Sequence, residues 1–362
     1  MRPTVITERR KAQVAIQVMS SSSCQPLSGR RSLGWTELKV SALALGTMQF
    51  GWSVSDVAAF DLLDRFAEAD GNFIDTADMY GPDQTRRSWQ LARPHVGISE
   101  DVIGRWMAER RNRDTMVVAT KVRARMWDGD DGEGLSRRHI IRAAEDSLRR
   151  LRTDRIDLYQ AHWPDSDTPL EETFATFQEL VDSGKVRYVG TSNYGLAGQL
   201  DAGATLWQAA PVPRLACEQP RYSLVHREEY ETLVRDVALE HNLGVICYSP
   251  LAAGFLTGKY RTEDEIRRSP RGRHLSQYGI AAGWALLEAL RKVAGNHGVP
   301  PAVVALSWML AQPGITAPIA GANSITQLES WLQAARVELE AEELLLLDDV
   351  SWQSSQIEFS SW

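Results

Sequence analysis

The sequence predicts an α/β protein built as a single (β/α)8 barrel. Short β-rich runs alternate with segments of helical period from Leu43 onward, which is typical of parallel strands joined by crossover helices. Eight such units in about 300 residues favour a closed barrel over an open, doubly wound sheet. No G-x-G-x-x-G segment follows the first run, which also argues against a dinucleotide-binding fold of the open type.

The eight expected strands are short and rich in β-branched, aromatic and small apolar residues. They cover residues 42–45, 73–75, 116–120, 156–160, 186–190, 215–219, 244–248 and 316–319. Short runs of this kind are typical of buried parallel strands.

The segments between these strands carry apolar residues at helical spacing. Leu170, Phe174, Phe177, Leu180 and Val181 form one stripe, and Gly184 follows where a left-handed C-terminal cap belongs. Three further stripes are Val57, Phe60, Leu63 and Phe66; Ile140, Ala144, Ser147, Leu148 and Leu151; and Tyr230, Val234, Val237 and Ala238.

The chain divides into three parts on this interpretation. Residues 1–30 are expected to be a flexible N-terminal extension, because their apolar patch is too brief for a secretory signal. The barrel spans residues 31–351, and residues 352–362 form a C-terminal tail.

Composition excludes several classes of protein. Of the 362 residues, 43% are hydrophobic and 24% are charged, which is ordinary for a globular protein and unlike a disordered one. The net charge of -7 argues against a nucleic-acid partner, and no uninterrupted apolar segment is long enough to span a membrane. Three cysteines without C-x-x-C spacing fit the reducing cytoplasm, where we expect the protein to be located.

Titratable residues stand at the ends of three consecutive strands. Asp75 and Tyr80 follow the second strand, Lys121 ends the third and His162 follows the fourth. The loops at the C-terminal ends of barrel strands all open on one face, so these side chains should converge.

Their chemistry suggests a proton relay. If Asp75 pairs with Lys121, the ammonium should lower the pKa of Tyr80 below its reference of about 10. Tyr80 would then act as a general acid while neutral His162 holds a carbonyl oxygen beside it. No side chain donates hydride, so reduction of that carbonyl requires a nicotinamide cofactor.

These residues lie in motifs that resemble the aldo-keto reductases, which are barrels that bind NADPH across the strand ends. The resemblance covers about 300 residues, in the family's order. It runs through 33–41 (LGWTELKVS), 45–48 (LGTM), 75–81 (DTADMYG), 120–121 (TK), 157–162 (DLYQAH), 184–193 (GKVRYVGTSN), 248–251 (YSPL), 258–260 (GKY) and 318–321 (PIAG). It implies that Tyr80 is the proton donor and that Asp75, Lys121 and His162 are its partners.

The resemblance also implies the residues that bind the cofactor. Ser192, Asn193 and Gln219 would hold the carboxamide, and Tyr248 would stack on the nicotinamide ring. The full expected set is Gly46, Thr47, Met48, Asp75, Ser192, Asn193, Gln219, Tyr248, Ser249, Pro250, Leu251, Gly254, Lys259, Arg261, Gly321, Asn323, Ser324 and Gln327.

The sequence departs from the family at the adenosine end of this site. Asn323 and Trp331 occupy positions where members commonly carry a Lys or Arg and an Asn. Ser324 and Thr326 nevertheless open a helix whose amides could accept a 2′-phosphate. Five arginines at 261, 267, 268, 271 and 273 are nearby in sequence, so NADPH is the expected cofactor and NADH is less favoured.

The substrate is expected to be a small carbonyl compound or alcohol. Trp52, Trp127 and Trp163 lie in loops after the first, third and fourth strands, where they could line a pocket together with Tyr80 and His162. No metal site is expected, because Asp75 and Asp78 have no convergent further ligands in the sequence. The oligomeric state is left open.

The residues alone leave two other functions open. The first is a regulatory or sensing subunit on the same fold that binds the cofactor with only incidental turnover. The second is an aldolase in which Lys121 forms a Schiff base.

Overall fold

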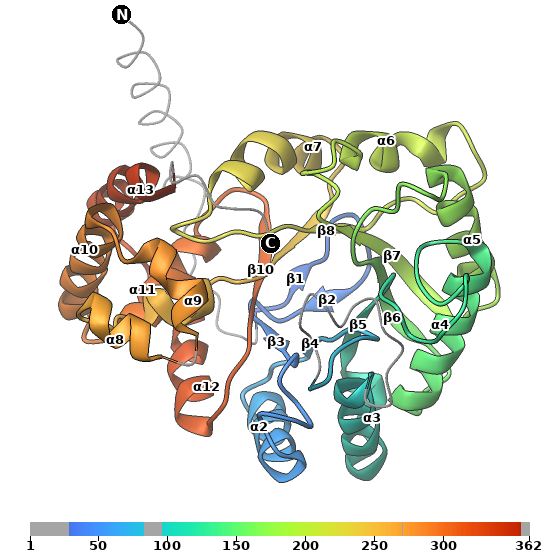
Figure 1. Ribbon diagram of the computed structural model, residues 1–362, viewed down its shortest axis with the longest axis horizontal. Helices are drawn as coiled ribbons and strands as arrows, with labels where there is room; N and C mark the ends of the chain where they lie inside the picture. The colour runs from blue at the N-terminus through green and yellow to red at the C-terminus, as the bar shows by residue number, and fades with distance from the viewer. Residues whose placement is uncertain (1–28, 83–95, 270, 356–362) are drawn as a thin grey trace, which may run out of the picture.

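Eight parallel strands close into a barrel surrounded by helices (Figure 1). The computed structural model describes residues 29–82, 96–269 and 271–355. The strands pair in the order β10-β3-β4-β5-β6-β7-β8-β9, so each contacts its neighbour in the chain and β10 closes the ring against β3. Their bounds are β3 Ala44–Gly46, β4 Phe73–Asp75, β5 Val117–Val122, β6 Ile156–Ala161, β7 Val186–Ser192, β8 Cys217–Gln219, β9 Gly244–Cys247 and β10 Ile315–Ala320. The predicted (β/α)8 barrel is confirmed.

Several strands end later than predicted. β5 continues through Lys121 and β7 through Ser192, because these polar side chains find partners at the end of the barrel and the ladder need not stop before them. The first barrel strand, by contrast, begins later than predicted, at Ala44 and not at Ala42. Ser41 to Leu43 form the turn that connects a preceding hairpin to this strand.

That hairpin, absent from the sequence prediction, consists of β1 (Arg31–Ser32) and β2 (Lys39–Val40). Its Leu33, Leu38 and Val40 are buried in one cluster with Phe73, Leu158 and Ile246 of the barrel strands. Gly34, with φ 56°, sits so close to the chain that an added Cβ would lie 2.5 Å from the carbonyl oxygen of Asn242. The hairpin therefore closes the end of the barrel opposite the strand carboxyl ends.

The helices that follow the strands form the outer layer, as predicted from their stripes. Their bounds are α2 Asp56–Glu68, α3 Ile98–Arg110, α4 Arg137–Leu151, α5 Leu170–Asp182, α6 Leu200–Thr205, α7 Arg235–Glu240, α8 Glu263–Arg268, α9 Gly272–Leu275, α10 Ala281–His297, α11 Pro301–Leu310, α12 Ile325–Leu332 and α13 Ala341–Ser355. The arginine-rich segment after β9 contains α8 and α9.

Single-turn and irregular helices complete the described chain. They are the 3-10 helices η2 Arg113–Thr115, η3 Leu206–Gln208, η5 Ala252–Thr257, η6 Ser276–Tyr278 and η7 Gln333–Arg336, and the π-helix η4 Glu229–Val234. The stripe predicted from Tyr230 to Ala238 thus begins as a π-helix and continues as α7. Val57 of the α2 stripe is 74% exposed, whereas Leu63 and Phe66 are buried.

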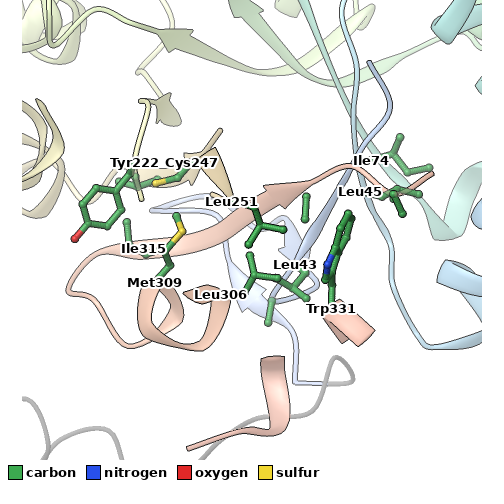
Figure 2. Close-up of a cluster of buried hydrophobic side chains, with 14 of the residues drawn as sticks. Leu43, Leu45, Ile74, Tyr222, Cys247, Leu251, Leu306, Met309, Ile315 and Trp331 are labelled. Carbon is green, nitrogen blue, oxygen red and sulfur yellow. The ribbon is translucent and has the colours of Figure 1, made fainter. Parts of the chain in front are cut away.

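A large apolar cluster joins the barrel to the outer helices. Figure 2 shows part of it, where Leu43 and Leu45 at the start of the barrel approach Trp331 of α12 and Leu306 of α11. At the end of the chain α13 lies alongside α10 and continues to Ser355, so the first residues of the expected tail are helical. Residues 1–28 of the expected extension and 356–362 of the tail lie outside the described part of the chain.

Candidate active site

A buried ion pair connects two adjacent strand ends at the mouth of the barrel. Asp75 ends β4 and Lys121 lies in β5, and the two side chains are 4% and 0% exposed. Lys121 Nζ donates to Asp75 Oδ1 at 2.9 Å, to Asp75 Oδ2 at 2.8 Å and to the carbonyl oxygen of Thr76 at 2.8 Å. Burial by itself would lower the pKa of Lys121, but the charge of Asp75 and the contact with Tyr80 outweigh it, so the net direction is upward. Lys121 is therefore a fixed ammonium.

The same ammonium contacts the phenol of Tyr80. Lys121 Nζ lies 3.3 Å from Tyr80 Oη and 5.1 Å from the centre of the ring. Burial raises the pKa of Tyr80 more than Lys121 lowers it, so the net direction is upward from 10.0 and opposite to the direction expected from the sequence. The phenol is thus a protonated hydroxyl held beside a fixed positive charge.

His162 follows β6 and faces this phenol. The rings of Tyr80 and His162 are edge to face with centroids 6.0 Å apart, and Trp163 stacks on the imidazole at 3.9 Å with an interplanar angle of 9°. Burial, with the charges of Lys121 and Arg123, holds the pKa of His162 well below 6.5, so the ring is neutral. Its Nδ1 is buried without a partner among the described residues, which leaves Nε2 as the ring nitrogen available to a ligand.

Amide and hydroxyl groups from the next three strands join this cluster. Gln219 Nε2 donates to Asp75 Oδ1 at 2.9 Å, and Ser192 Oγ donates to the Gln219 carbonyl at 2.8 Å. Asn193 Nδ2 donates to the His162 carbonyl at 3.0 Å, and Tyr248 Oη donates to Asn193 Oδ1 at 2.9 Å. The structure therefore brings the four predicted catalytic residues and the four predicted nicotinamide-side residues together.

The loop after β9 contains three successive left-handed residues. Ala252, Ala253 and Gly254 have φ angles of 48°, 55° and 98°, and the N–H groups of Ala252 and Gly254 already donate to the carbonyls of Ser249 and Leu251. Lys259 Nζ would lie 3.6 Å from a Cβ placed on Gly254. In this loop the Lys259 ammonium, and not the row of N–H groups, is therefore the group that can contact an anion.

The other predicted cofactor residues are arranged less uniformly. Gly46 ends β3 and Met48 follows it, while Ser249, Pro250 and Leu251 follow β9 at this same end of the barrel. Thr47 is buried, and its hydroxyl already donates to the Asp75 carbonyl at 2.9 Å and accepts from Ser99. It can therefore support Asp75, but it has no donor to spare for a ligand.

The predicted adenosine end lies after β10. Gly321 is exposed, and Ser324 caps α12 by accepting from the N–H of Gln327. The Gln327 side chain accepts a hydrogen bond from the N–H of Asn323 at 3.0 Å, so these two predicted cofactor residues are hydrogen-bonded to each other. Arg261 is exposed after η5, and its N–H is bonded to Glu265 at 2.6 Å.

The three predicted pocket tryptophans differ in their contacts. Trp163 packs with Tyr80 and Met126 in a small apolar cluster, in addition to its stacking on His162. Trp127 belongs to the edge of this cluster, but its ring also lies 4.7 Å from that of His139 and under the guanidinium of Arg142. Trp52 is 42% exposed and donates to the Met48 carbonyl.

Comparison with known proteins decides the family. The Aldo/keto reductase family matches residues 42–351. The chain belongs to the aldo/keto reductase family. It is 36% identical over 328 residues to the uncharacterized oxidoreductase YrpG of Bacillus subtilis, with 88% of this chain and 94% of that protein covered. This membership supports a general oxidoreductase activity.

Two further relatives show the range of the family. Aldo-keto reductase YhdN of Bacillus subtilis is 32% identical over 83% of this chain and 86% of its own length. A probable voltage-gated potassium channel subunit beta of Arabidopsis thaliana is 31% identical over 85% of this chain and 91% of its own length.

The structure adds residues that the sequence analysis of this aldo/keto reductase missed. Thr76 binds Lys121 through its carbonyl, and the Gln160 side chain lies 3.4 Å from that of Gln219. Glu218 is completely buried beside Gln219. A glutamate inside a predicted buried strand is a visible signal, because a carboxylate is seldom buried without several donors.

Two negative findings concern the described residues. Within residues 29–82, 96–269 and 271–355, no three His, Cys, Asp or Glu side chains converge as metal ligands. Over the same ranges, no helix is both long and apolar enough to cross a membrane.

Proposed function

We propose that the protein is an NADPH-dependent oxidoreductase that reduces an aldehyde or ketone to an alcohol, with Tyr80 as the proton donor. The observation that carries this proposal is the position of Lys121, whose ammonium contacts both Asp75 and the phenol oxygen of Tyr80. A protonated phenol next to a fixed cation can release its proton as charge develops on a carbonyl oxygen, because the cation stabilises the phenolate left behind.

Each side chain would have a separate role at the carbonyl oxygen. When bound, a reduced nicotinamide supplies the hydride, since no side chain can. Tyr80 Oη delivers the proton to the carbonyl oxygen, and neutral His162 donates from Nε2 to hold that oxygen in place. Lys121 stabilises the resulting phenolate, and Asp75 keeps Lys121 charged and oriented.

Residues already in contact with this group would hold the cofactor. Ser192, Asn193 and Gln219 offer the hydroxyl and amide groups that a carboxamide requires, and the face of Tyr248 can support a flat ring. Lys259, whose ammonium lies beside Gly254, would contact the diphosphate. We assign the 2′-phosphate to the N-terminus of α12, which makes NADPH the preferred cofactor.

The substrate side favours apolar or flat carbonyl compounds. Trp163, Met79, Met126 and part of Trp127 surround the approach to Tyr80. Such a lining buries apolar surface, while Tyr80 and His162 supply the polar contacts. The corresponding alcohol would be the substrate of the reverse reaction.

The direct test measures NADPH absorbance with a panel of aromatic and aliphatic aldehydes and ketones. Turnover with at least one class of carbonyl is expected, and Tyr80→Phe should reduce it by about 10² to 10⁴ while NADPH still binds. Wild-type turnover in Tyr80→Phe would contradict the role of Tyr80.

A second candidate is a cofactor-binding regulatory subunit. Similarity to a protein described as a probable channel subunit beta favours it. Tight NADPH binding, with negligible turnover across the whole carbonyl panel, would support this candidate over the first.

An aldolase that uses Lys121 as a Schiff-base nucleophile is disfavoured. A nucleophilic amine must be neutral, whereas Lys121 is bonded to Asp75 and Thr76 and its pKa is raised. Borohydride treatment with a carbonyl substrate should therefore leave no covalent adduct on the protein.

A cytoplasmic location is part of the same proposal. Cys217 and Cys247 are free thiols buried in the described structure, as a reducing compartment permits. Cys24 lies outside the described residues. Fractionation of cells that express the full chain would test the location.

A further inference from the structure

Glu218 is a completely buried carboxylate that ties β8 to the turn after β7. Thr191 Oγ1 donates to Glu218 Oε2 at 2.5 Å, and the N–H of Tyr194 donates to Oε1 at 2.9 Å. The N–H groups of Asn193 and Gly195 are close enough to lower the pKa of this carboxylate further. One hydroxyl and the backbone N–H groups of a single turn therefore surround one side chain.

This arrangement determines the shape of the turn that carries Asn193. Asn193 has φ 64°, a left-handed conformation that is uncommon for residues other than glycine. Its side chain connects three strand ends, because Nδ2 donates to the His162 carbonyl and Ser192 Oγ while Oδ1 accepts from Tyr248 Oη. The carboxylate thus stabilises the backbone conformation that directs this amide.

We propose that Glu218, in its ionised form, is a positioning residue that holds the Ser192–Asn193 turn in the shape that binds the cofactor, so that its protonation weakens cofactor binding. The inference rests on the proposed function, because it takes Ser192 and Asn193 as ligands of the nicotinamide carboxamide. A neutral carboxyl carries its own O–H and accepts more weakly than a carboxylate from the Thr191 hydroxyl and the Tyr194 N–H. The turn should then loosen without any loss of the catalytic side chains.

The surroundings of Glu218 place this change near neutral pH. Burial raises the pKa of Glu218 to about 7, against the lowering effect of Thr191 and the three N–H groups. The other titratable groups that interact with it are Glu229 of η4, the phenols of Tyr194 and Tyr248, and the thiols of Cys217 and Cys247. Burial raises the pKa of those phenols and thiols, so they stay neutral, and it raises the pKa of Glu229 to about 8.

The test measures the Kd of NADPH by fluorescence titration between pH 5.5 and 8.5 in four proteins. In the wild type, binding should tighten by about tenfold as Glu218 ionises, the value of one lost charge-assisted hydrogen bond. Glu218→Gln should lose this step and bind with the weaker affinity throughout. The 2′-phosphate of the cofactor itself titrates near pH 6, but it does so in every variant, so the difference between variants isolates the protein group.

Two matched variants separate Glu218 from its neighbours. Thr191→Val removes one donor to the ionised form, so the midpoint of the step should move to higher pH. Glu229→Gln removes the adjacent carboxyl, which is hydrogen-bonded to the backbone of Arg221, and should leave a step in place. If Glu218→Gln does not fold, the upward shift in Thr191→Val still decides the question.

Other outcomes would overturn the inference. The same pH dependence in wild type and Glu218→Gln would do so, as would loss of the step in Glu229→Gln or an unmoved midpoint in Thr191→Val. Absence of NADPH binding by the wild type at every pH would instead contradict the proposed function. The KM for NADPH should rise in Glu218→Gln much more than kcat falls, because Glu218 touches neither Tyr80 nor Lys121.

Discussion

Lys121 Nζ is held by both carboxylate oxygens of Asp75, at 2.9 and 2.8 Å, where neither side chain is more than 4% exposed. An ion pair at this depth gives up hydration that its partner and a few neighbouring hydrogen bonds must replace. Loss of one member therefore leaves the other charge in a place where it is poorly solvated.

This relationship predicts a non-additive effect on stability. Lys121→Met should lower the free energy of unfolding by about 3–5 kcal/mol, because Asp75 is left charged and buried, with Gln219 as its remaining side-chain donor among the described residues. The double variant with Asp75→Asn should be more stable than Lys121→Met alone, since no buried charge is left unpaired. Denaturant unfolding of the two single variants and the double variant measures the coupling, and simple additivity would mean that the pair is not a unit.

Turnover should show the same coupling. If Asp75 acts only by keeping Lys121 charged and oriented toward Tyr80, then removing Asp75 from a protein that already lacks Lys121 should cause little further loss of turnover. NADPH-dependent turnover of the double variant should therefore be much higher than the product of the two single losses implies. Losses that multiply strictly would mean that Asp75 and Lys121 contribute independently, contrary to the relay.

The sequence was informative about this site because barrel geometry is regular. Residues directly after parallel strands must meet on one face, so Asp75, Lys121, His162 and Gln219 could be placed together without coordinates. The direction of the pKa change at Tyr80 could not be obtained in this way, because it depends on whether the upward effect of burial or the downward effect of the Lys121 charge is larger. The two-residue strands of the hairpin were also missed, because they are too short to show a period of two.

The same limit explains the residues that support the site. Ser99 in α3 bonds to Thr47, and Thr191 bonds to Glu218, across separations of 52 and 27 residues. Such contacts arise from tertiary packing, and the local pattern around each residue carries no sign of them. The tryptophans after the strands were predicted as a group, yet only the structure distinguishes Trp163 on His162 from the exposed Trp52.

The neutral state of His162 gives a prediction for the pH dependence of the site. A histidine whose pKa is lowered well below 6.5 carries no charge at pH 6 or above, and a phenol whose pKa is raised keeps its proton at pH 9. At saturating NADPH and substrate, kcat should therefore show no ionisation of either residue between pH 6 and 9. A bell-shaped profile with both limbs in this range would contradict the assignment.

Trp163 provides a way to test the cause of this neutral state. Its ring covers the imidazole at 3.9 Å, so Trp163→Ala should admit water and raise the pKa of His162 toward its ordinary value. Trp163→Phe keeps a flat apolar cover and should leave the pKa low. Nitrogen NMR of the His162 ring from pH 4 to 8 measures the pKa of His162 in both variants. An identical titration in the two variants would show that burial by Trp163 is not the cause of the low pKa.

The N-terminus of α12 gives a prediction for cofactor choice. Ser324 caps this helix through its Oγ, and we have assigned the 2′-phosphate to the adjacent N–H groups. Ser324→Asp keeps a capping oxygen but adds a negative charge, whereas Ser324→Asn keeps the cap without the charge. Repulsion between the new carboxylate and the phosphate should weaken NADPH binding by about 5- to 30-fold, or roughly 1–2 kcal/mol, and leave NADH binding nearly unchanged. Ser324→Asn should retain the wild-type preference, which separates the effect of charge from that of capping.

Dissociation constants for both cofactors at low and high salt measure this effect of the Ser324→Asp charge on NADPH binding, and screening should reduce it at high salt. A Ser324→Asp protein that binds NADPH as tightly as Ser324→Asn does would place the 2′-phosphate elsewhere, with the exposed arginines after η5 as the next site to examine.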